Sequence, residues 1–148
     1  MYRKKVILLV IIALILTGCT KIDSNIDNVI SATMSNEVDS VNTVSTGYEL
    51  YIPIGVRQLV DNEYNQEFKI KNTRVYLYVD TVSYYYKNRL NYETDGKYNY
   101  YYKSILLNDK FGYVGINKLE DDNYFCEIVY NYSKIEFYAV EEEIPVVL

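Results

Sequence analysis

The acidic residues are the side chains of this sequence that could do chemistry. None of the 148 residues is histidine, which removes the commonest general base and the commonest metal ligand. Two carboxylates suffice for glycoside hydrolysis, and Asp80 interrupts the apolar and aromatic run VYLYVDTV. Asp80 could therefore belong to a catalytic pair. We favour the alternative that it accepts a hydrogen bond from a tyrosine hydroxyl or a backbone amide and holds a bend.

Two further groups have simpler interpretations. Glu120-Asp121-Asp122 lacks the glycine and the spaced ligands of a calcium loop, so it predicts a solvated turn. Cys126 lies between apolar neighbours in NYFCEIVY and has no histidine to activate it, which favours a small buried hydrophobic residue. There is also no glycine-rich phosphate loop. We therefore expect no catalytic residue, no metal and no cofactor.

Tyrosine is the most unusual feature of the composition. The chain has 19 tyrosines, and it repeats the motif of three tyrosines and a lysine in SYYYKN (83–88) and NYYYKS (99–104). A tyrosine ring suits interfaces and sugar stacking, because it combines an apolar face with a hydroxyl. If both runs are straight strands, Tyr85 and Tyr101 point away from their neighbours and are the candidate binding residues. The alternatives are ordinary strand packing and the codon bias of an A/T-rich genome.

The N-terminus indicates where the protein goes. Three cations, Arg3, Lys4 and Lys5, precede an uncharged apolar run over 6–16, which is too short to span a membrane. Leu16, Thr17, Gly18 and Cys19 follow, and this LTGC sequence resembles the lipobox of bacterial lipoproteins.

The resemblance covers only the first 19 residues, and it implies a complete lipoprotein signal. Residues 1–18 would be a signal peptide, cleaved between Gly18 and Cys19, and the Cys19 thiol would carry a diacylglyceryl group. The mature protein would be anchored in the cell membrane by its lipid, on the extracytoplasmic face. The alternatives are an ordinary signal peptide with a chance cysteine and an uncleaved anchor.

Charge limits the class of partner. The net charge is −5, and loss of the three N-terminal cations makes it about −8 for the mature part. An acidic protein without a lysine-rich run is not expected to bind nucleic acid. The remaining 130 or so residues suit one domain and a tether.

The composition divides the mature chain into two parts. Residues 19–47 are rich in Ser, Thr, Asn and Asp, and only the lipidated cysteine and isolated apolar residues interrupt them, which predicts a flexible linker. The alternative is a short amphipathic helix near Ile26 to Met34. Residues 48–148 predict a tyrosine-rich β-domain, since stretches of Tyr, Val and Ile alternate with Asn, Asp and Gly turns.

The expected fold is mainly β, a small antiparallel meander, curled sheet or barrel. We expect a helical turn at 55–63, a hairpin around Asp95-Gly96 that joins the two tyrosine runs, and a bulge at Gly115. Residues 124–132 and 133–140 lack a turn between them and could form one bent strand. Period two places Glu127 on a solvent-facing side, and residues 141–148 predict a frayed tail or an edge strand.

These observations favour a non-catalytic binding domain at the cell surface. The partner could be an envelope protein or a wall glycan. The globular part resembles tyrosine-rich lipoproteins of A/T-rich Gram-positive bacteria, a likeness that implies no particular activity and no site residues. The alternatives are a glycan-acting enzyme that uses Asp80 with another carboxylate and a purely structural protein of envelope assembly.

Overall fold

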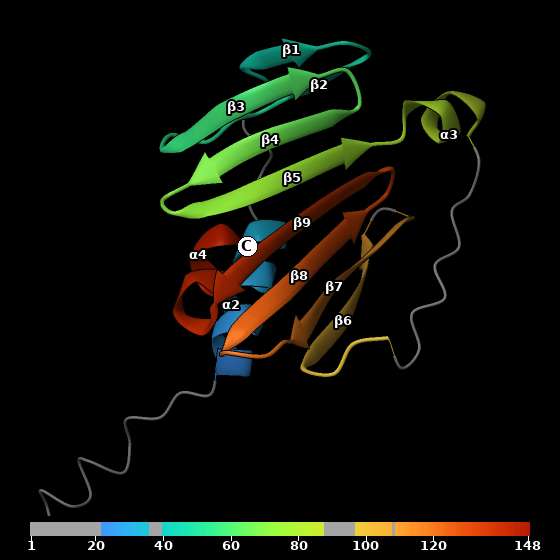
Figure 1. The fold of residues 1–148 in the computed structure, drawn as a ribbon. Helices are drawn as coiled ribbons and strands as arrows, with labels where there is room; N and C mark the ends of the chain where they lie inside the picture. Colours follow the sequence, from blue (N-terminus) through green and yellow to red (C-terminus); the bar gives the residue numbers. More distant parts are fainter. Residues whose placement is uncertain (1–21, 36–39, 88–96, 108) are drawn as a thin grey trace, which may run out of the picture.

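The computed structural model describes residues 22–35, 40–87, 97–107 and 109–148, which form a mainly β structure (Figure 1). The elements are, in chain order, α2 (Ile22–Ser35), β1 (Thr43–Ser45), β2 (Tyr48–Leu50), β3 (Val56–Asn62), β4 (Asn65–Ile70), β5 (Thr73–Val79), α3 (Thr81–Tyr86), β6 (Tyr101–Leu107), β7 (Lys110–Lys118), β8 (Asn123–Tyr130), β9 (Ser133–Val140), the 3₁₀ turn η1 (Glu141–Glu143) and α4 (Ile144–Val147).

Among the described residues, seven strands form one antiparallel sheet in the order β3-β4-β5-β9-β8-β7-β6. The sheet consists of two meanders, β3 to β5 and β6 to β9, which join where β5 pairs with β9. The short strands β1 and β2 form a separate hairpin around Gly47, whose φ of +85° favours glycine. The predicted antiparallel β fold is confirmed. The sheet is open rather than closed into a barrel, with β3 and β6 at its edges.

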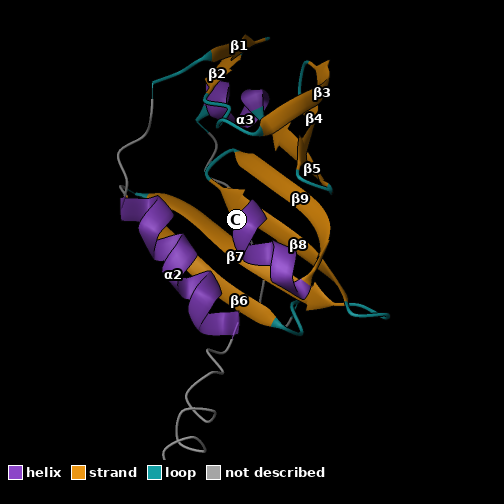
Figure 2. Ribbon diagram, turned by 90° about the vertical axis from the view of Figure 1, so that its left-hand side faces the viewer, coloured by secondary structure: helices purple, strands orange, loops and turns teal. Residues whose placement is uncertain are grey.

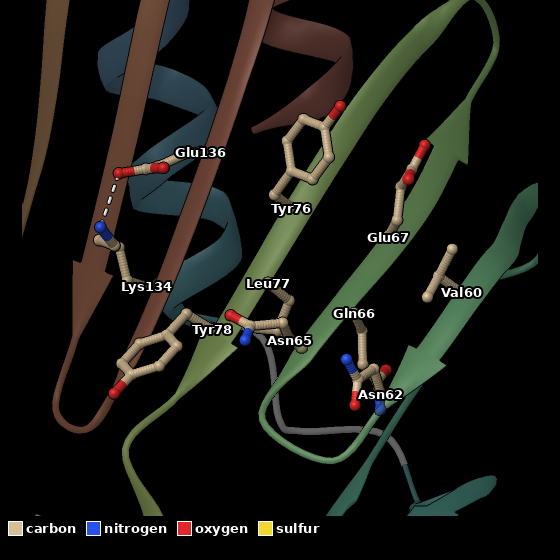
Figure 3. Close-up of a pocket in the computed structure, with 10 residues that line it drawn as sticks. All are labelled: Val60, Asn62, Asn65, Gln66, Glu67, Tyr76, Leu77, Tyr78, Lys134 and Glu136. Atoms are coloured by element: carbon tan, nitrogen blue, oxygen red, sulfur yellow. Dashed lines mark hydrogen bonds and ion pairs between the residues drawn. The ribbon is translucent and has the colours of Figure 1, made fainter.

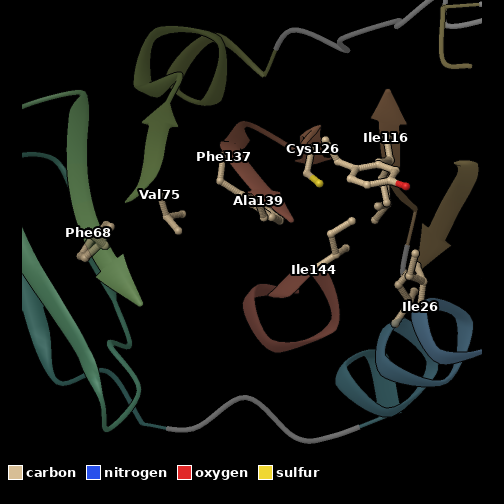
Figure 4. Close-up of a cluster of buried hydrophobic side chains, with 11 residues drawn as sticks. Ile26, Phe68, Val75, Ile116, Cys126, Phe137, Ala139 and Ile144 are labelled. Atoms are coloured by element: carbon tan, nitrogen blue, oxygen red, sulfur yellow. The ribbon is translucent and has the colours of Figure 1, made fainter. Parts of the chain in front are cut away.

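One face of the sheet carries the apolar core, and the helices α2 and α4 cover it (Figure 2). Paired positions across five neighbouring strands supply Phe68, Val75, Phe137, Cys126 and Ile116. The helices add Ile26 and Ile144 (Figure 4), together with Ile30. Cys126 is completely buried, and burial raises the pKa of its thiol to about 12, so it has the structural role that the sequence predicts.

Helix α2 corrects the prediction of a flexible linker over 19–47. Ile22 to Ser35 are helical, and Ile26 and Ile30 are buried with 0% and 7% of their surface exposed. Met34 continues the same stripe and packs against the core. The three residues are spaced by four, so they share one helix face, as the alternative of an amphipathic helix requires. The residues between them are mainly polar and mostly exposed, which is why the segment resembles a linker in composition.

The two tyrosine runs do not form the predicted hairpin. The first run belongs to the helix α3, and Lys87 ends that helix in the left-handed conformation with a φ of 54°. The second run enters β6, which is an edge strand and pairs with β7. Asp95 and Gly96, the expected turn, lie outside the described residues. The two tyrosine runs are similar in sequence but adopt different backbone conformations, helical in α3 and extended in β6.

Three smaller expectations are also wrong. Residues 55–63 contain the strand β3 instead of a helical turn, and β3 begins just after Gly55, whose φ is +93°. A tight turn at Asn131, with a φ of 53°, separates β8 from β9, so these strands are not one bent strand. The final segment forms η1 and α4 because Ile144 packs into the core with no exposed surface.

Candidate functional site

The face of the sheet opposite α2 and α4 carries the candidate site. Side chains alternate along β5, so every second residue enters the core while Tyr76 and Tyr78 lie on the opposite face. Their cross-strand partners on β9 are Glu136 and Lys134. Tyr76 is 44% exposed and Tyr78 is 43% exposed. Both rings therefore offer apolar surface to a ligand on this face.

A hollow of about 390 Å³ lies on this face between β3 and β9 (Figure 3). We call it the open-face pocket. Its volume falls within the range of roughly 300–1,000 Å³ that is typical of small-molecule sites. The side chains around it combine aromatic, amide and charged groups, and they include Asn62, Asn65, Glu67, Tyr76, Tyr78, Lys134 and Glu136.

A β-bulge shapes the β3 side of the pocket. The register of β3 against β4 shifts between Gln58 and Val60, so one extra residue, Leu59, is inserted. After the shift Val60 pairs with Glu67 and joins the lining of the pocket. A bulge turns the side chains that follow it to the other face of the sheet, and bulges are common next to binding sites. The pocket therefore depends on this irregularity.

The charged groups of the pocket are paired. Glu67 accepts a 2.8 Å hydrogen bond from Arg74, and Lys134 donates a 2.7 Å hydrogen bond to Glu136. Each carboxylate retains acceptor capacity, because an ionised carboxylate offers about four lone-pair sites. The pocket thus presents hydrogen-bonding groups with little net charge.

Glu127 lies next to Glu136 across the β8–β9 pair, on the same face, yet it is only 5% exposed. Its Oε1 atom accepts hydrogen bonds from the hydroxyls of Tyr98 and Tyr113 and, at 2.9 Å, from the ammonium group of Lys97. Burial by itself would raise the pKa of Glu127, but these three donors outweigh it and lower the pKa to about 2. The prediction that Glu127 faces solvent is therefore wrong, because Tyr98 covers it.

Gly115 makes this cover possible. A Cβ atom at Gly115 would overlap the ring of Tyr98, which lies directly above the strand β7. The strand keeps a continuous register with β6 and β8 through Gly115, so the expected bulge is absent there. Tyr98 also stacks on Tyr102, with ring centroids 5.8 Å apart and planes inclined by 11°. This aromatic cluster borders the open face on the β6 side.

Asp80 has the bend-holding role that we favoured. Its carboxylate accepts a 2.8 Å hydrogen bond from the backbone N–H of Ser83 and caps the first turn of α3. The hydrogen bond from the backbone of Ser83 lowers the pKa of Asp80. The carboxylate thus stabilises the passage from β5 into α3, which the apolar run VYLYVDTV does not reveal.

The structure separates the two candidate tyrosines. Tyr85 lies on α3 and is 79% exposed, and its ring contacts that of Tyr86 edge to face at 5.2 Å. Tyr101 lies on the face covered by α2, where its hydroxyl donates a 2.8 Å hydrogen bond to Asp27. The prediction that Tyr101 faces outward is wrong, because Tyr102 occupies that side of β6 and is 42% exposed.

The remaining sequence-predicted residues have simpler positions. Asp121 and Asp122 lie in the turn between β7 and β8, as expected, and Lys118 forms a 3.1 Å ion pair with Asp122. Over the described ranges, no group of three or more Cys, Asp or Glu side chains is arranged to hold a metal. Gly18 and Cys19, with the rest of the lipobox, lie outside those ranges.

The structure combines an open antiparallel sheet, helices packed on one of its faces, and an aromatic, hydrogen-bonding pocket on the other. No protein-family model matches the chain, and neither a curated protein nor a solved structure shows significant similarity to it. The site therefore has to be interpreted from its own geometry.

Local sequence patterns do not predict the open-face pocket. The alternation of residues along β5 does indicate that Tyr76 and Tyr78 lie on one face of the sheet, opposite the core residues Val75 and Leu77. The pairing of β5 with β9 leaves no such signal in the local sequence, because 53 residues lie between Val79 and its partner Ser133. The pairing brings Glu136 and Lys134 to the pocket.

Proposed function

We propose that this protein is a lipid-anchored, non-catalytic binding protein on the extracytoplasmic face of the cell membrane. The lipobox supports the anchor, with cleavage between Gly18 and Cys19 and lipid on the Cys19 thiol. No helix in the described part of the chain is long and apolar enough to cross a membrane. The partner is an envelope protein or a wall glycan.

The open-face pocket, and not the rest of the uncovered face, is the proposed binding surface. The observation that carries this proposal is the open-face pocket, in which half-exposed Tyr76 and Tyr78 stand beside paired charges. Exposed aromatic rings next to convergent polar groups are typical of ligand sites. Tyr85 on α3 is proposed as an additional contact residue, since it has the largest exposed fraction among the described tyrosines.

The position of α2 adds a geometric expectation. Only Thr20 and Lys21 separate Cys19 from the first residue of the helix, and three peptide units reach about 10 Å when fully extended. Because α2 packs on the sheet through Ile26 and Ile30, the lipid would hold the domain close to the membrane. This replaces the long tether that the linker prediction implied.

The other functions receive less support. Asp80 is engaged at the N-terminus of α3, and Glu67 and Glu136 are each ion-paired. A glycan-acting enzyme needs one carboxyl that carries a proton to the leaving group, whereas ion-paired carboxylates are suited to accept hydrogen bonds. A purely structural role would leave the exposed pocket unused.

The anchor and the binding surface are tested separately. Mass spectrometry of the mature N-terminus is expected to show a diacylglyceryl-modified Cys19, and the Cys19→Ser protein is expected to leave the membrane fraction. Membrane retention of an unprocessed Cys19→Ser protein would contradict the anchor.

The binding surface is tested in two assays. In the first, the detergent-solubilised protein is incubated with purified cell walls, which are then sedimented. In the second, the membrane-bound protein is crosslinked to its neighbours in isolated membranes. We expect saturable binding that Tyr76→Ser and Tyr78→Ser together reduce and that Tyr138→Ser leaves unchanged. Tyr138 is a matched control, because it is 60% exposed and does not line the pocket. Equal binding by the unaltered protein, the double variant at Tyr76 and Tyr78, and the Tyr138→Ser variant would contradict the proposed surface.

A further inference from the structure

The open-face pocket has a floor that cannot take up another strand. The pocket lies over β4, β5 and β9, with the edge strand β3 along one side, and the register pairs β4 with β3 and β5, and β5 with β4 and β9. Backbone N–H and C=O groups in the middle of a sheet are already bonded, so an extended peptide cannot add to them. A ligand must therefore be held by side chains.

The side chains alternate between apolar and hydrogen-bonding surface. Tyr76 and Tyr78 stand two residues apart on one strand, and each offers a ring and a hydroxyl. Asn62 and Asn65 end the β3–β4 pair, where they face each other and contribute amide donors and acceptors. A pyranose ring has the matching chemistry, an apolar face of C–H groups surrounded by hydroxyls that donate and accept.

The charges favour a neutral ligand. Glu67 is paired with Arg74, and Glu136 with Lys134, so the lining presents no uncompensated ionic group from these strands. An anionic ligand would meet two carboxylates, and a cationic ligand would compete with two existing ion pairs. Neutral hydroxyl groups can instead bond to the spare lone pairs of the carboxylates and leave both pairs intact.

From these observations we infer that the open-face pocket binds a neutral segment of a glycan, with a pyranose ring against Tyr76 or Tyr78. The inference rests on the proposed binding function and names its ligand class. Tyr76 and Tyr78 supply apolar contact, Glu67 and Glu136 accept hydrogen bonds from sugar hydroxyls, and Asn62 and Asn65 contribute to orientation. A volume of about 390 Å³ limits the bound segment to a short one.

The test uses the full chain in detergent micelles and three neutral oligosaccharides: tetramers of β-1,4-linked N-acetylglucosamine, of β-1,4-linked glucose and of α-1,4-linked glucose. Binding is measured by calorimetry up to ~10 mM, well beyond the weak ~1 mM range of dissociation constants. We expect saturable binding of at least one of the three. Tyr76→Ala or Tyr78→Ala should weaken it about tenfold, as expected for loss of one aromatic contact.

Two further variants separate ligand contact from a structural effect. Tyr76→Phe keeps the ring, so it should bind more tightly than Tyr76→Ala. Tyr138→Ala, on the same face of the sheet but outside the pocket lining, should bind like the unaltered protein. Far-ultraviolet circular dichroism confirms that each variant is folded.

Several outcomes would overturn the inference: no saturable binding of any oligosaccharide, equal weakening by Tyr138→Ala, or competition by an unrelated peptide as strong as that by the sugar. None of these outcomes contradicts the proposed function, because lipid on Cys19 and binding to walls or membranes through the open face are measured independently. If the unaltered protein binds an oligosaccharide but binds neither cell walls nor a membrane partner, the proposed function is contradicted and the inference about the pocket is not.

Discussion

The ring of Tyr98 packs directly on Gly115 and occupies the space that a side chain at position 115 would need. The hydroxyl of the same tyrosine donates a hydrogen bond to the buried Glu127. One glycine in the strand β7 thus allows a segment just before β6 to pack on the sheet and to bury a carboxylate beneath it.

Gly115→Ala is expected to lower the free energy of unfolding by about 1–3 kcal/mol, because the new methyl group forces the Tyr98 ring away from β7. Urea denaturation followed by circular dichroism measures the change. An alanine at an exposed strand glycine normally has the opposite effect, since glycine is unfavourable in strands.

The double variant supplies the control. In a Tyr98→Ala background the clash is gone, so Gly115→Ala should cost much less there. Equal costs in the two backgrounds would show that the two positions do not interact.

Stability should decrease in acid through Glu127. Its pKa is about 2 in the folded protein against a reference value of 4.5, so the unfolded chain takes up a proton at higher pH than the folded one. The stabilisation is therefore complete above about pH 4.5 and is lost as the pH falls toward 2. Urea denaturation at a series of pH values measures it.

Glu127→Gln removes the titrating group, so the stability of this variant should depend less on pH between 4.5 and 2. Its stability at neutral pH should be lower by about 1–3 kcal/mol, because charge-assisted hydrogen bonds from Lys97, Tyr98 and Tyr113 are weakened. An unchanged acid dependence would assign the effect to other carboxylates.

Docking of α2 should contribute strongly to stability. Ile26→Ala removes a completely buried side chain and should cost about 2–5 kcal/mol, the usual range for isoleucine-to-alanine changes in a core. Thr33→Ala, at an exposed position of the same helix, should be neutral or slightly stabilising because alanine favours helices. A negligible change in the free energy of unfolding for Ile26→Ala would contradict the docking of α2 and would favour a flexible linker instead.

The proposed lipid anchor on Cys19 should orient the domain on the membrane. The N-terminal end of α2 and the helix α3 lie at opposite ends of the structure (Figures 1 and 2). A fluorescent label on Asn25→Cys should therefore be quenched more strongly by a quencher on lipid headgroups than a label on Tyr85→Cys. The measurement uses the lipidated protein in vesicles, and buried Cys126 is not expected to react.

Insertion of a Gly/Ser spacer after Lys21 serves as the control, since it should reduce the quenching at position 25. Equal quenching at both positions without the spacer would show that the domain has no preferred orientation on the membrane.

Much of the fold could be predicted from local patterns. The alternation of Ile135, Phe137 and Ala139 with polar neighbours correctly assigns the core face of β9, and the buried role of Cys126 follows from its apolar context. The helix α2 gives a weaker local signal, because its buried residues Ile26, Ile30 and Met34 are separated mainly by polar residues. Three tyrosines in a row favour a strand by propensity, but the Asp80 cap starts a helix there.

The antiparallel β class and the core face of individual strands follow from the sequence, because they depend on period-two alternation and on neighbouring residues. Which distant segments meet depends on the tertiary structure. The pairing of β5 with β9 brings Tyr76 beside Glu136, and the packing of Tyr98 over Gly115 buries Glu127. Such contacts depend on the global arrangement of strands, which no local spacing of residues encodes. The open-face pocket is their product.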